Sequence, residues 1–575
     1  MKTYGEKGHI QEGWIMHNQK KILSLTDVHQ YIHQIYFQLV RTDDMYMLKT
    51  NWKNILNILF KDPVSYIEEV GLICKLILHT RDIGFGKGER NISYMMLLEL
   101  YNVHELLAVT IFDHFVKKQP NKTCIGSWKD VKRFSEYIIK ETDDKNHNFI
   151  KYMINISNIH LRSDYQQIVD IYTLFQDKDE EKIKKYIQNN VELTLVAKWL
   201  PRKGRDNRKY AWLFNKLADN MHRHYFKTVY TKNRKVDCKK LKRAIKKSEM
   251  EYRKMVSFVN KHLNVVEILQ TSNKTQYINF NNVPSRAREQ YHKSFLTDPK
   301  SRTNYVSYLN SKQYIHSNCY LYEIVKKIIT LKLWDKPITD IHRQTIIKMW
   351  NSKKININSM NNIALVDMSC SMNDIPLFNS IALGLFIAEH NTGEFYNKLM
   401  TFGNKPSWIT FNDTMDICDK VGCVIENKNN INSDLYSIFN VLINIVKSNC
   451  LSKQKLKPIT MTILSDMQID QNVNLKQNCL YSTINNMFQV ANIEKPQIIF
   501  WNLKYSNGFP IFTTHKYQDV LMFSGYSEKI LLYFRSTCKK SKDTSTNCNF
   551  FLFNMLSDKR YDFINTEIVN ILLVK

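Results

Sequence analysis

Turn-forming residues are scarce in this sequence: its 575 residues include only 15 glycines and 11 prolines. An all-β fold needs many tight turns, which glycine and proline favour, so the composition disfavours that class. Long apolar runs are also missing, and Ile381 to Ala388 is far shorter than the roughly 20 residues that span a bilayer. The polar segment Met1 to Trp14 does not resemble a signal peptide. We therefore expect a mainly helical, intracellular and cytoplasmic protein without membrane contact.

Catalytic signatures are missing as well. The 11 cysteines are scattered without a CxxC pair, which favours reduced thiols over a zinc site. No GxSxG elbow, HExxH pair or cysteine–histidine arrangement is present. We expect a non-enzymatic binding protein. The alternative is an enzyme, a metal-dependent phosphodiesterase. Only the cleavage of RNA in the presence of Mg²⁺ would support this alternative.

Basic residues, in contrast, are abundant and unevenly distributed. The chain has 82 basic and 54 acidic residues, a formal charge of +28, of which residues 1–350 carry +24 and residues 351–575 carry +4. Such a surplus attracts polyanions, so RNA is the expected partner of the N-terminal part. The lysine content also fits the codon usage of an AT-rich genome. In that alternative the chain is a protein-interaction scaffold without nucleic acid.

The first 350 residues show helical periodicity. Asp62 and Pro63 are typical of a helix start, and apolar residues continue at helical spacing to Ile77. Many similar segments follow one another, which predicts an all-α array over residues 1–350, such as a HEAT-like one.

After a polar linker at residues 351–362, the pattern changes to short apolar runs that alternate with helical segments. This alternation predicts an α/β domain over residues 363–575, with a parallel sheet covered on both faces. Helices are expected at residues 375–390, 433–447, 481–491 and 526–534. The expected strands are Ile363–Met368, Lys398–Phe402, Ile459–Leu464, Gln497–Leu503 and Val520–Phe523.

Oxygen-bearing side chains follow two of these strands. Asp367, Ser369 and Ser371 form an Asp-x-Ser-x-Ser loop after the first strand, and Asp466 follows a later one. Ligands bind beyond the carboxyl ends of strands in open α/β sheets, and Mg²⁺ prefers oxygen ligands. The pattern predicts a metal site with room for an acidic group from a partner. The alternative is that Asp367 and Ser371 only cap the following helix.

This loop resembles the metal-ion-dependent adhesion site of von Willebrand factor A domains. Asp367, Ser369 and Ser371 match its first motif, and Asp466 matches a later aspartate. Ser433 stands before a helix where the family has threonine, and Cys370 replaces the usual glycine. The resemblance implies a Rossmann-like fold that holds Mg²⁺, Mn²⁺ or Ca²⁺ and binds an acidic side chain of a protein partner.

Two basic segments of the helical part are candidates for RNA contact. The first, residues 80–90, places three of the 15 glycines within five residues, but Lys87 is followed by glycine and the spacing is not that of a phosphate-binding P-loop. Either Arg81, Lys87 and Arg90 contact a nucleic-acid backbone, or the segment is a tight connection between helices. The second segment, Arg223 to Lys254, is either an RNA-binding surface with interleaved tyrosines such as Tyr225 and Tyr252 or a solvated helix face. Its basic residues include Lys239, Lys240, Lys242, Arg243, Lys246 and Lys247.

Several short motifs are similar to those of a family called domain of unknown function 2828. That family occurs in large DNA viruses and in eukaryotes, which allows a virion location, and it has no settled activity. A helical module followed by a von Willebrand A domain is also similar to the TROVE proteins of the Ro type, which bind small RNAs in a ring of helical repeats. The motifs are Arg81-Asp82 with Gly86 to Arg90, Gly126 to Asp130, Ala197 to Arg202, Pro284 to Arg288 and Leu464 to Gln468.

Overall fold

The structure is a computed structural model of the chain. It describes residues 25–118, 124–175, 179–203, 209–227, 229, 237–263, 265–283, 285–311, 319–333, 340–353, 361–402, 407–427, 439–440, 443, 460–467, 479–492, 495–505, 520–533 and 548–573.

The chain forms two compact units. One contains residues 1–107 together with residues 319–575, and the other contains residues 108–318. This division differs from the single boundary expected at residues 351–362, because the first helices fold against the C-terminal sheet. We call the two parts the sheet unit and the basic unit.

The sheet unit begins with helices that pack against one another. Helix α3 packs on α2 and α5, and α4 also packs on α5. Helix α4 begins at Ile67, later than expected, because Asp62 accepts hydrogen bonds from the Ser65 amide and hydroxyl in a turn instead of capping the helix. The helices are α2 (Leu25–Gln38), α3 (Tyr46–Leu59), α4 (Ile67–Arg81) and α5 (Arg90–Val103), and α6 (Glu105–Val116) crosses the boundary between the units.

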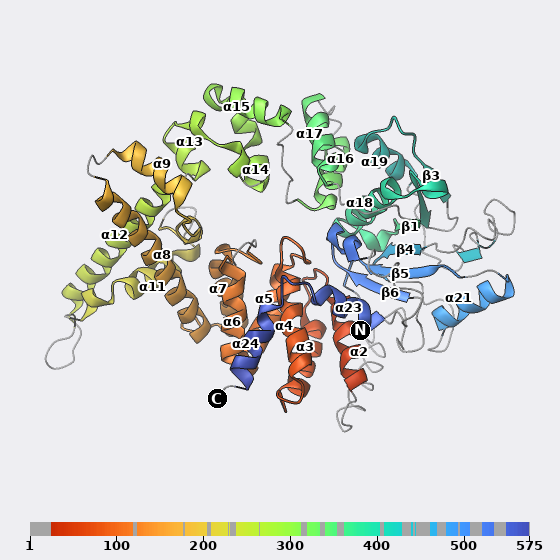
Figure 1. Ribbon diagram of the computed structural model, residues 1–575, viewed down its shortest axis with the longest axis horizontal. Helices are drawn as coiled ribbons and strands as arrows, with labels where there is room; N and C mark the ends of the chain where they lie inside the picture. Colours follow the sequence, from red (N-terminus) through yellow and green to blue (C-terminus); the bar gives the residue numbers. More distant parts are fainter. Residues whose placement is uncertain are drawn as a thin grey trace, which may run out of the picture. The chain divides into compact units, whose positions relative to one another are not determined.

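The sheet has six strands in the order β3-β2-β1-β4-β5-β6, all parallel to their neighbours except the edge strand β3 (Figure 1). All five expected strands are confirmed within one residue at either end. The sequence missed β3, whose four residues are too few to show a pattern. The strands are β1 (Asn362–Asp367), β2 (Lys398–Phe402), β3 (Ser407–Thr410), β4 (Thr460–Ser465), β5 (Gln497–Asn502) and β6 (Val520–Ser524).

Helices cover both faces of the sheet, because neighbouring residues of a strand point to opposite sides. Leu365 belongs to a buried cluster with Ile484 and Phe488 of α21, whereas Val366 lies under Gly384 of α18, where a β-carbon would come within 2.3 Å of the Val366 side chain. The expected helix at 526–534 is instead a 3₁₀ helix, η9 (Glu528–Tyr533), and most of the one expected at 433–447 lies outside the described residues. The helices are α18 (Ile375–His390), α19 (Ile417–Glu426), α21 (Cys479–Val490), α23 (Cys548–Leu556) and α24 (Phe563–Leu572).

Helix α2 joins the N-terminal helices to the sheet through its last carbonyl groups. These carbonyls have no partner inside the helix. Ser524 Oγ donates to the Tyr36 carbonyl at 2.6 Å, and Asn502 Nδ2 donates to the Phe37 carbonyl at 3.0 Å. Ser524 and Asn502 are the last residues of β6 and β5. The carboxyl ends of these two strands therefore cap α2.

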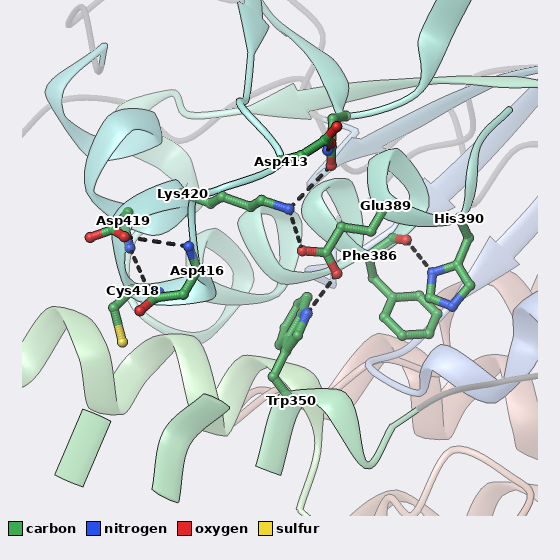
Figure 2. Close-up of polar contacts among 10 residues, drawn as sticks. Trp350, Phe386, Glu389, His390, Asp413, Asp416, Cys418, Asp419 and Lys420 are labelled. Atoms are coloured by element: carbon green, nitrogen blue, oxygen red, sulfur yellow. Dashed lines mark hydrogen bonds and ion pairs between the residues drawn. The ribbon is translucent and has the colours of Figure 1, made fainter. Parts of the chain in front are cut away.

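Two further helices, α16 (Leu321–Leu333) and α17 (Asp340–Asn351), attach to α18 and α19. Figure 2 shows Trp350 of α17 pointing at Glu389, which also pairs with Lys420. The indole Nε1 and the Lys420 ammonium each lie 2.7 Å from a Glu389 carboxylate oxygen, and Lys420 is buried. Arg343 pairs with Asp416 at 2.6 Å. The end of the helical series is thus fixed to the α/β part by ionic contacts.

The basic unit is entirely helical among its described residues. Its long helices α8 and α12 pack on each other and on α11 (Figure 1). The predicted N-terminal helical array is confirmed, and its HEAT-like repeat stays a prediction. The elements are α7 (Lys129–Thr142), α8 (Asn148–Leu174), α9 (Glu180–Asn190), α10 (Val196–Trp199), α11 (Ala211–Met221), η2 (Arg223–Phe226), α12 (Cys238–His262), α13 (Val266–Thr271), η3 (Thr275–Tyr277), η4 (Phe280–Asn282), α14 (Ser285–Thr297) and α15 (Pro299–Asn310).

Within the described ranges, no helix combines the length and the apolar composition that crossing a bilayer demands.

Candidate functional site

The carboxyl ends of β1 and β4 lie side by side at the centre of the sheet. The two strands pair in parallel, with Val366 opposite Leu464. The chain continues from β1 to β2 on one side and places β4 on the other, so this is the switch point where open α/β sheets bind ligands. Asp367 ends β1 and Asp466 directly follows β4. The structure brings together the two strand ends that the sequence singled out.

Asp367 organises the loop around it. Its Oδ1 accepts a hydrogen bond from the Ser369 amide at 2.9 Å, and its Oδ2 accepts one from the Ser465 hydroxyl at 2.5 Å. The Ser369 and Ser371 hydroxyls are 2.9 Å apart. Asp367, Ser369 and Asp466 are buried, and Ser371 is half-buried. Carboxylate and hydroxyl oxygens therefore gather at one point, as a hard cation requires.

The electrostatics of this point favour a bound cation. Burial raises the pKa of Asp367, and the negative charge of Asp466 raises it further. Two buried carboxylates that repel each other are stabilised when a cation lies between them. Lys504, beyond β5, donates to the Ser371 carbonyl at 2.6 Å, and its positive charge at the rim of the loop opposes the binding of a cation there.

The fifth predicted ligand, Ser433, lies outside the described residues. Among the residues that are described, no group of three or more His, Cys, Asp or Glu side chains could hold a metal ion. A metal at this edge would therefore depend on the hydroxyls as well as on the two carboxylates. The oxygen donors of Asp367, Ser369, Ser371 and Asp466 fit Mg²⁺ better than a soft metal.

Sequence reasoning missed two groups at this site. Ser465 lies in the Leu464 to Gln468 motif, but no role at the site is predicted for it from the sequence. A hydroxyl next to an aspartate at the end of a strand was a signal that could have identified it. Lys504 gave no signal, because only the pairing of β4 with β5 brings the segment after β5 to the Ser371 loop.

The glycine-rich segment at residues 80–90 is a buried connection and not an exposed basic loop. Lys87 is fully buried, and its ammonium donates to the Tyr36 carbonyl at 2.7 Å, the Leu39 carbonyl at 3.1 Å and Ser524 Oγ at 2.5 Å. Burial lowers the pKa of Lys87 well below its usual range, and the charge of Glu89 opposes this shift. Lys87 thus helps to cap α2 and has no surface to offer a phosphate.

The neighbouring basic residues are also placed away from solvent. Arg81 is only 2% exposed, and Arg90 is half-buried at the start of α5. The expectation that Arg81 and Lys87 contact nucleic acid is therefore corrected, because both side chains are enclosed by the fold. The alternative interpretation, a tight connection between helices, describes this segment.

Close packing explains the glycines of this connection. A β-carbon at Gly86 would come within 1.9 Å of the His79 carbonyl oxygen. Gly88 has a φ of +68°, and a β-carbon there would come within 1.8 Å of the Tyr320 hydroxyl, which donates to the Lys87 carbonyl. Both positions require glycine because no side chain fits.

Asp82 holds the same connection to the C-terminal end of the chain. Its buried carboxylate accepts from Arg560 Nε at 2.5 Å and from the Tyr561 hydroxyl at 2.9 Å. It also accepts from the amides of Gly84 and Phe85. The Arg81-Asp82 motif is thus a structural element of the sheet unit.

The basic residues of α12, in contrast, are on the surface. The exposed side chains are Lys239, Lys240, Lys242, Arg243, Lys246 and Lys247. Lys240 lies 3.7 Å from Asp237, and Lys247 stands over the Tyr225 ring at 4.4 Å from its centre. Lys239, Lys242, Arg243 and Lys246 form no ion pair with any described residue. Tyr252, one of the interleaved tyrosines, is fully buried and cannot stack on a base.

Two segments of the chain match known families of protein domains. Residues 155–318 match the domain of unknown function DUF2828, and residues 361–558 match the domain of unknown function DUF7788. An uncharacterized protein of Acanthamoeba polyphaga mimivirus is 25% identical over 496 residues, which are 81% of this chain and 77% of the relative. The chain is thus similar to a viral protein along most of its length, with a DUF2828 segment in the basic unit and a DUF7788 segment around the sheet.

Proposed function

We propose that the α/β part is a von Willebrand factor A-like binding domain with a metal-ion-dependent site at the ends of β1 and β4. Asp367, Ser369, Ser371 and Asp466 would hold Mg²⁺, or Mn²⁺ or Ca²⁺ in its place. The convergence of two strands that end in buried carboxylates carries this proposal. The cation would then bind an acidic side chain of a protein partner, because the protein supplies few negative oxygens of its own.

Thermal unfolding of the full chain tests the metal site. Mg²⁺ at a hundredfold excess over its dissociation constant stabilises the native state by about 2.7 kcal/mol, which raises the melting temperature by a few degrees. Asp367→Asn should abolish the response. Asp413→Asn, at an exposed carboxylate of the same domain, should keep it. An equal Mg²⁺ response of wild type and Asp367→Asn would refute the assignment.

We also propose that the basic unit binds single-stranded RNA along α12. Residues 108–318 contain 42 basic and 21 acidic residues, so this unit carries +21 of the total charge of +28. Four exposed basic residues of α12 have no acidic partner among the described residues, so their charge is available to phosphates. The likeness to the TROVE proteins supports this proposal by analogy only.

Binding of a labelled RNA to the full chain tests the second proposal. Reversal of Lys239, Lys242, Arg243 and Lys246 to Glu should weaken binding and its salt dependence, because each lost phosphate contact removes about 0.7 from the log–log slope. Reversal of four lysines in the sheet unit should change neither. Unchanged RNA affinity after the α12 reversals would favour the scaffold alternative.

A further inference from the structure

A pocket lies beside α12 within the basic unit. Helices α8 and α11 and the turn η2 line an open pocket of about 270 Å³. This volume is slightly below the usual range for small-molecule sites, so the pocket suits one compact group. The residues that matter here are Asn155, Asn158, Ile159, Arg162, Asn220 and Arg223.

One face of α8 forms the wall of this pocket. Asn155, Asn158, Ile159 and Arg162 are spaced three, four and seven residues apart, and such residues share one side of a helix. Asn155 and Arg162 are exposed, and Ile159 keeps 58% of its surface exposed. The wall therefore offers an accessible apolar side chain between polar ones.

The pocket is positively charged. Arg162 and Arg223 line it, and its lining contains no acidic residue. One terminal nitrogen of Arg162 donates to the Met221 carbonyl and to Met221 Sδ, both at 3.3 Å, which fixes the guanidinium. Its Nε and its other terminal nitrogen form no hydrogen bond with a described residue. Guanidinium groups bind phosphate oxygens through paired hydrogen bonds. An anion is the ligand that this charge favours.

Asn158 adds a neutral acceptor. The side chain is 4% exposed, and its Nδ2 donates to the Leu217 carbonyl and to Asn220 Oδ1, both at 2.9 Å. Two acceptors on the nitrogen fix the orientation of the amide. Its Oδ1 is buried and has no hydrogen-bond partner among the described residues. A buried acceptor without a donor is unfavourable, so a ligand that donates an N–H group would be stabilised there.

We propose that this pocket binds one nucleotide of a single-stranded RNA, with its phosphate at Arg162 and Arg223 and an N–H of its base at Asn158 Oδ1. The exposed side chain of Ile159 would contact the base. This inference rests on the proposed RNA binding of the basic unit and names the place where a base is held. A phosphopeptide would satisfy the arginines but has no base to match the amide acceptor and the apolar wall.

The pocket also adjoins the basic surface of α12. Tyr225 follows Arg223 and His224 in η2, and Lys247 of α12 stands over the Tyr225 ring. The His222 ring also stacks on the Tyr225 ring, with 5.5 Å between the two ring centroids. An RNA backbone that follows α12 can therefore place a nucleotide in the pocket.

Calorimetric titration of the full chain with 5′-AMP, adenosine and inorganic phosphate tests the pocket. We expect 5′-AMP to bind at least tenfold more tightly than inorganic phosphate. Asn158→Ala should lower the 5′-AMP affinity to that of phosphate, whereas Arg162→Gln should weaken both. Asn260→Ala is a matched control, because Asn260 is also buried and donates to two main-chain carbonyls but lies outside the pocket. Arg302→Gln, at an exposed arginine of α15, controls for the lost charge.

Ile159→Glu keeps the test decisive if Asn158→Ala does not fold. Ile159 is largely exposed, so the change should preserve the fold while its carboxylate repels the phosphate. Abolished 5′-AMP binding supports the pocket. Unchanged binding by Ile159→Glu, equal affinity for 5′-AMP and phosphate, or tighter binding of a phosphoserine peptide would overturn it.

The four α12 reversals separate this inference from the RNA proposal. They should weaken binding of a ten-nucleotide RNA but leave the 5′-AMP affinity within about twofold. If the RNA binds and 5′-AMP does not, the pocket assignment fails and the RNA proposal stands. If 5′-AMP binds and the RNA does not, the RNA proposal fails.

Discussion

The connection at residues 80–90 and helix α12 both present lysines, yet the fold uses them in opposite ways. Lys87 is fully buried with three oxygen acceptors around its ammonium, whereas the lysines of α12 point into solvent. The difference lies in the chain around them. Glycines at 86 and 88 allow the first segment to lie against other backbone, and α12 keeps its buried positions for residues such as Ala244 and Val256. A basic segment thus indicates RNA contact only where the neighbouring residues leave its charged side chains on the surface.

The same substitution at the two regions should have very different effects on stability. Lys87→Met removes the Lys87 donor from the Leu39 carbonyl and from Ser524 Oγ, at roughly 1–3 kcal/mol for each unsatisfied group, whereas the Tyr36 carbonyl keeps the Ser524 hydroxyl. We expect a loss of about 3 kcal/mol or more in the free energy of unfolding. Lys239→Met should stay within about 0.5 kcal/mol of wild type. Urea unfolding measures both, and a Lys87→Met protein as stable as Lys239→Met would contradict the structural role of Lys87.

RNA affinity should show the reverse ranking. We expect the four α12 reversals to lower the affinity for a single-stranded RNA about 100-fold, which is about 2.7 kcal/mol. The log–log salt slope should fall by about 3, because four phosphate contacts are lost. Fluorescence anisotropy at several salt concentrations measures both quantities. A uniform slope in wild type and variant would place the RNA elsewhere.

Acid should weaken the buried region more than the exposed one. Burial, aided by the charge of Lys87, lowers the pKa of His33 to about 4 and that of His79 to about 3. Both histidines have an unfolded pKa near 6.5, so the unfolded state binds more protons and stability falls as the pH drops below about 6.5. For His79 the loss between pH 7 and pH 5 is about 2 kcal/mol. Unfolding of His79→Gln should show a smaller pH dependence by this amount, and an unchanged dependence would contradict the burial of His79.

The smallest expected effect is on the stability of the metal-free protein when Asp367, at the proposed metal site, is replaced. Burial and the charge of Asp466 destabilise ionised Asp367, as its raised pKa indicates. In the presence of a chelator, Asp367→Asn should therefore raise the free energy of unfolding slightly, because the neutral amide avoids the cost of a buried charge next to Asp466. Asp413→Asn should change it little. A clear loss of stability in Asp367→Asn would mean that the carboxylate serves the fold and not a ligand.

The sequence predicted five of the six strands well because these strands are mostly buried. Runs such as Ile363–Met368 and Val520–Phe523 are apolar on both faces, which is the pattern of a parallel sheet between helices. The meeting of Asp367 and Asp466 at one edge of the sheet was predictable for the same reason, since these carboxylates directly follow two such runs. The edge strand β3, with its largely exposed residues, lacks this signal.

Long-range partners were beyond sequence reasoning. The burial of Lys87 depends on Ser524, 437 positions away, and that of Asp82 depends on Arg560. Neither pairing follows from local periodicity, which reports only a residue's own element. The sequence also provided no indication that the Asn158 side chain is buried and oriented by hydrogen bonds, because both depend on the packing of α11 against α8.

The most direct test of separate metal and RNA sites compares three full-length proteins: wild type, Asp367→Asn and the α12 fourfold reversal. For each, the Mg²⁺-dependent change in melting temperature and the affinity for one labelled single-stranded RNA are measured. We expect Asp367→Asn to lose the Mg²⁺ response and keep wild-type RNA affinity, and the α12 variant to lose RNA affinity and keep the Mg²⁺ response. Loss of both properties in either variant, or of neither in both, would contradict the assignment of two functions to two parts of the chain.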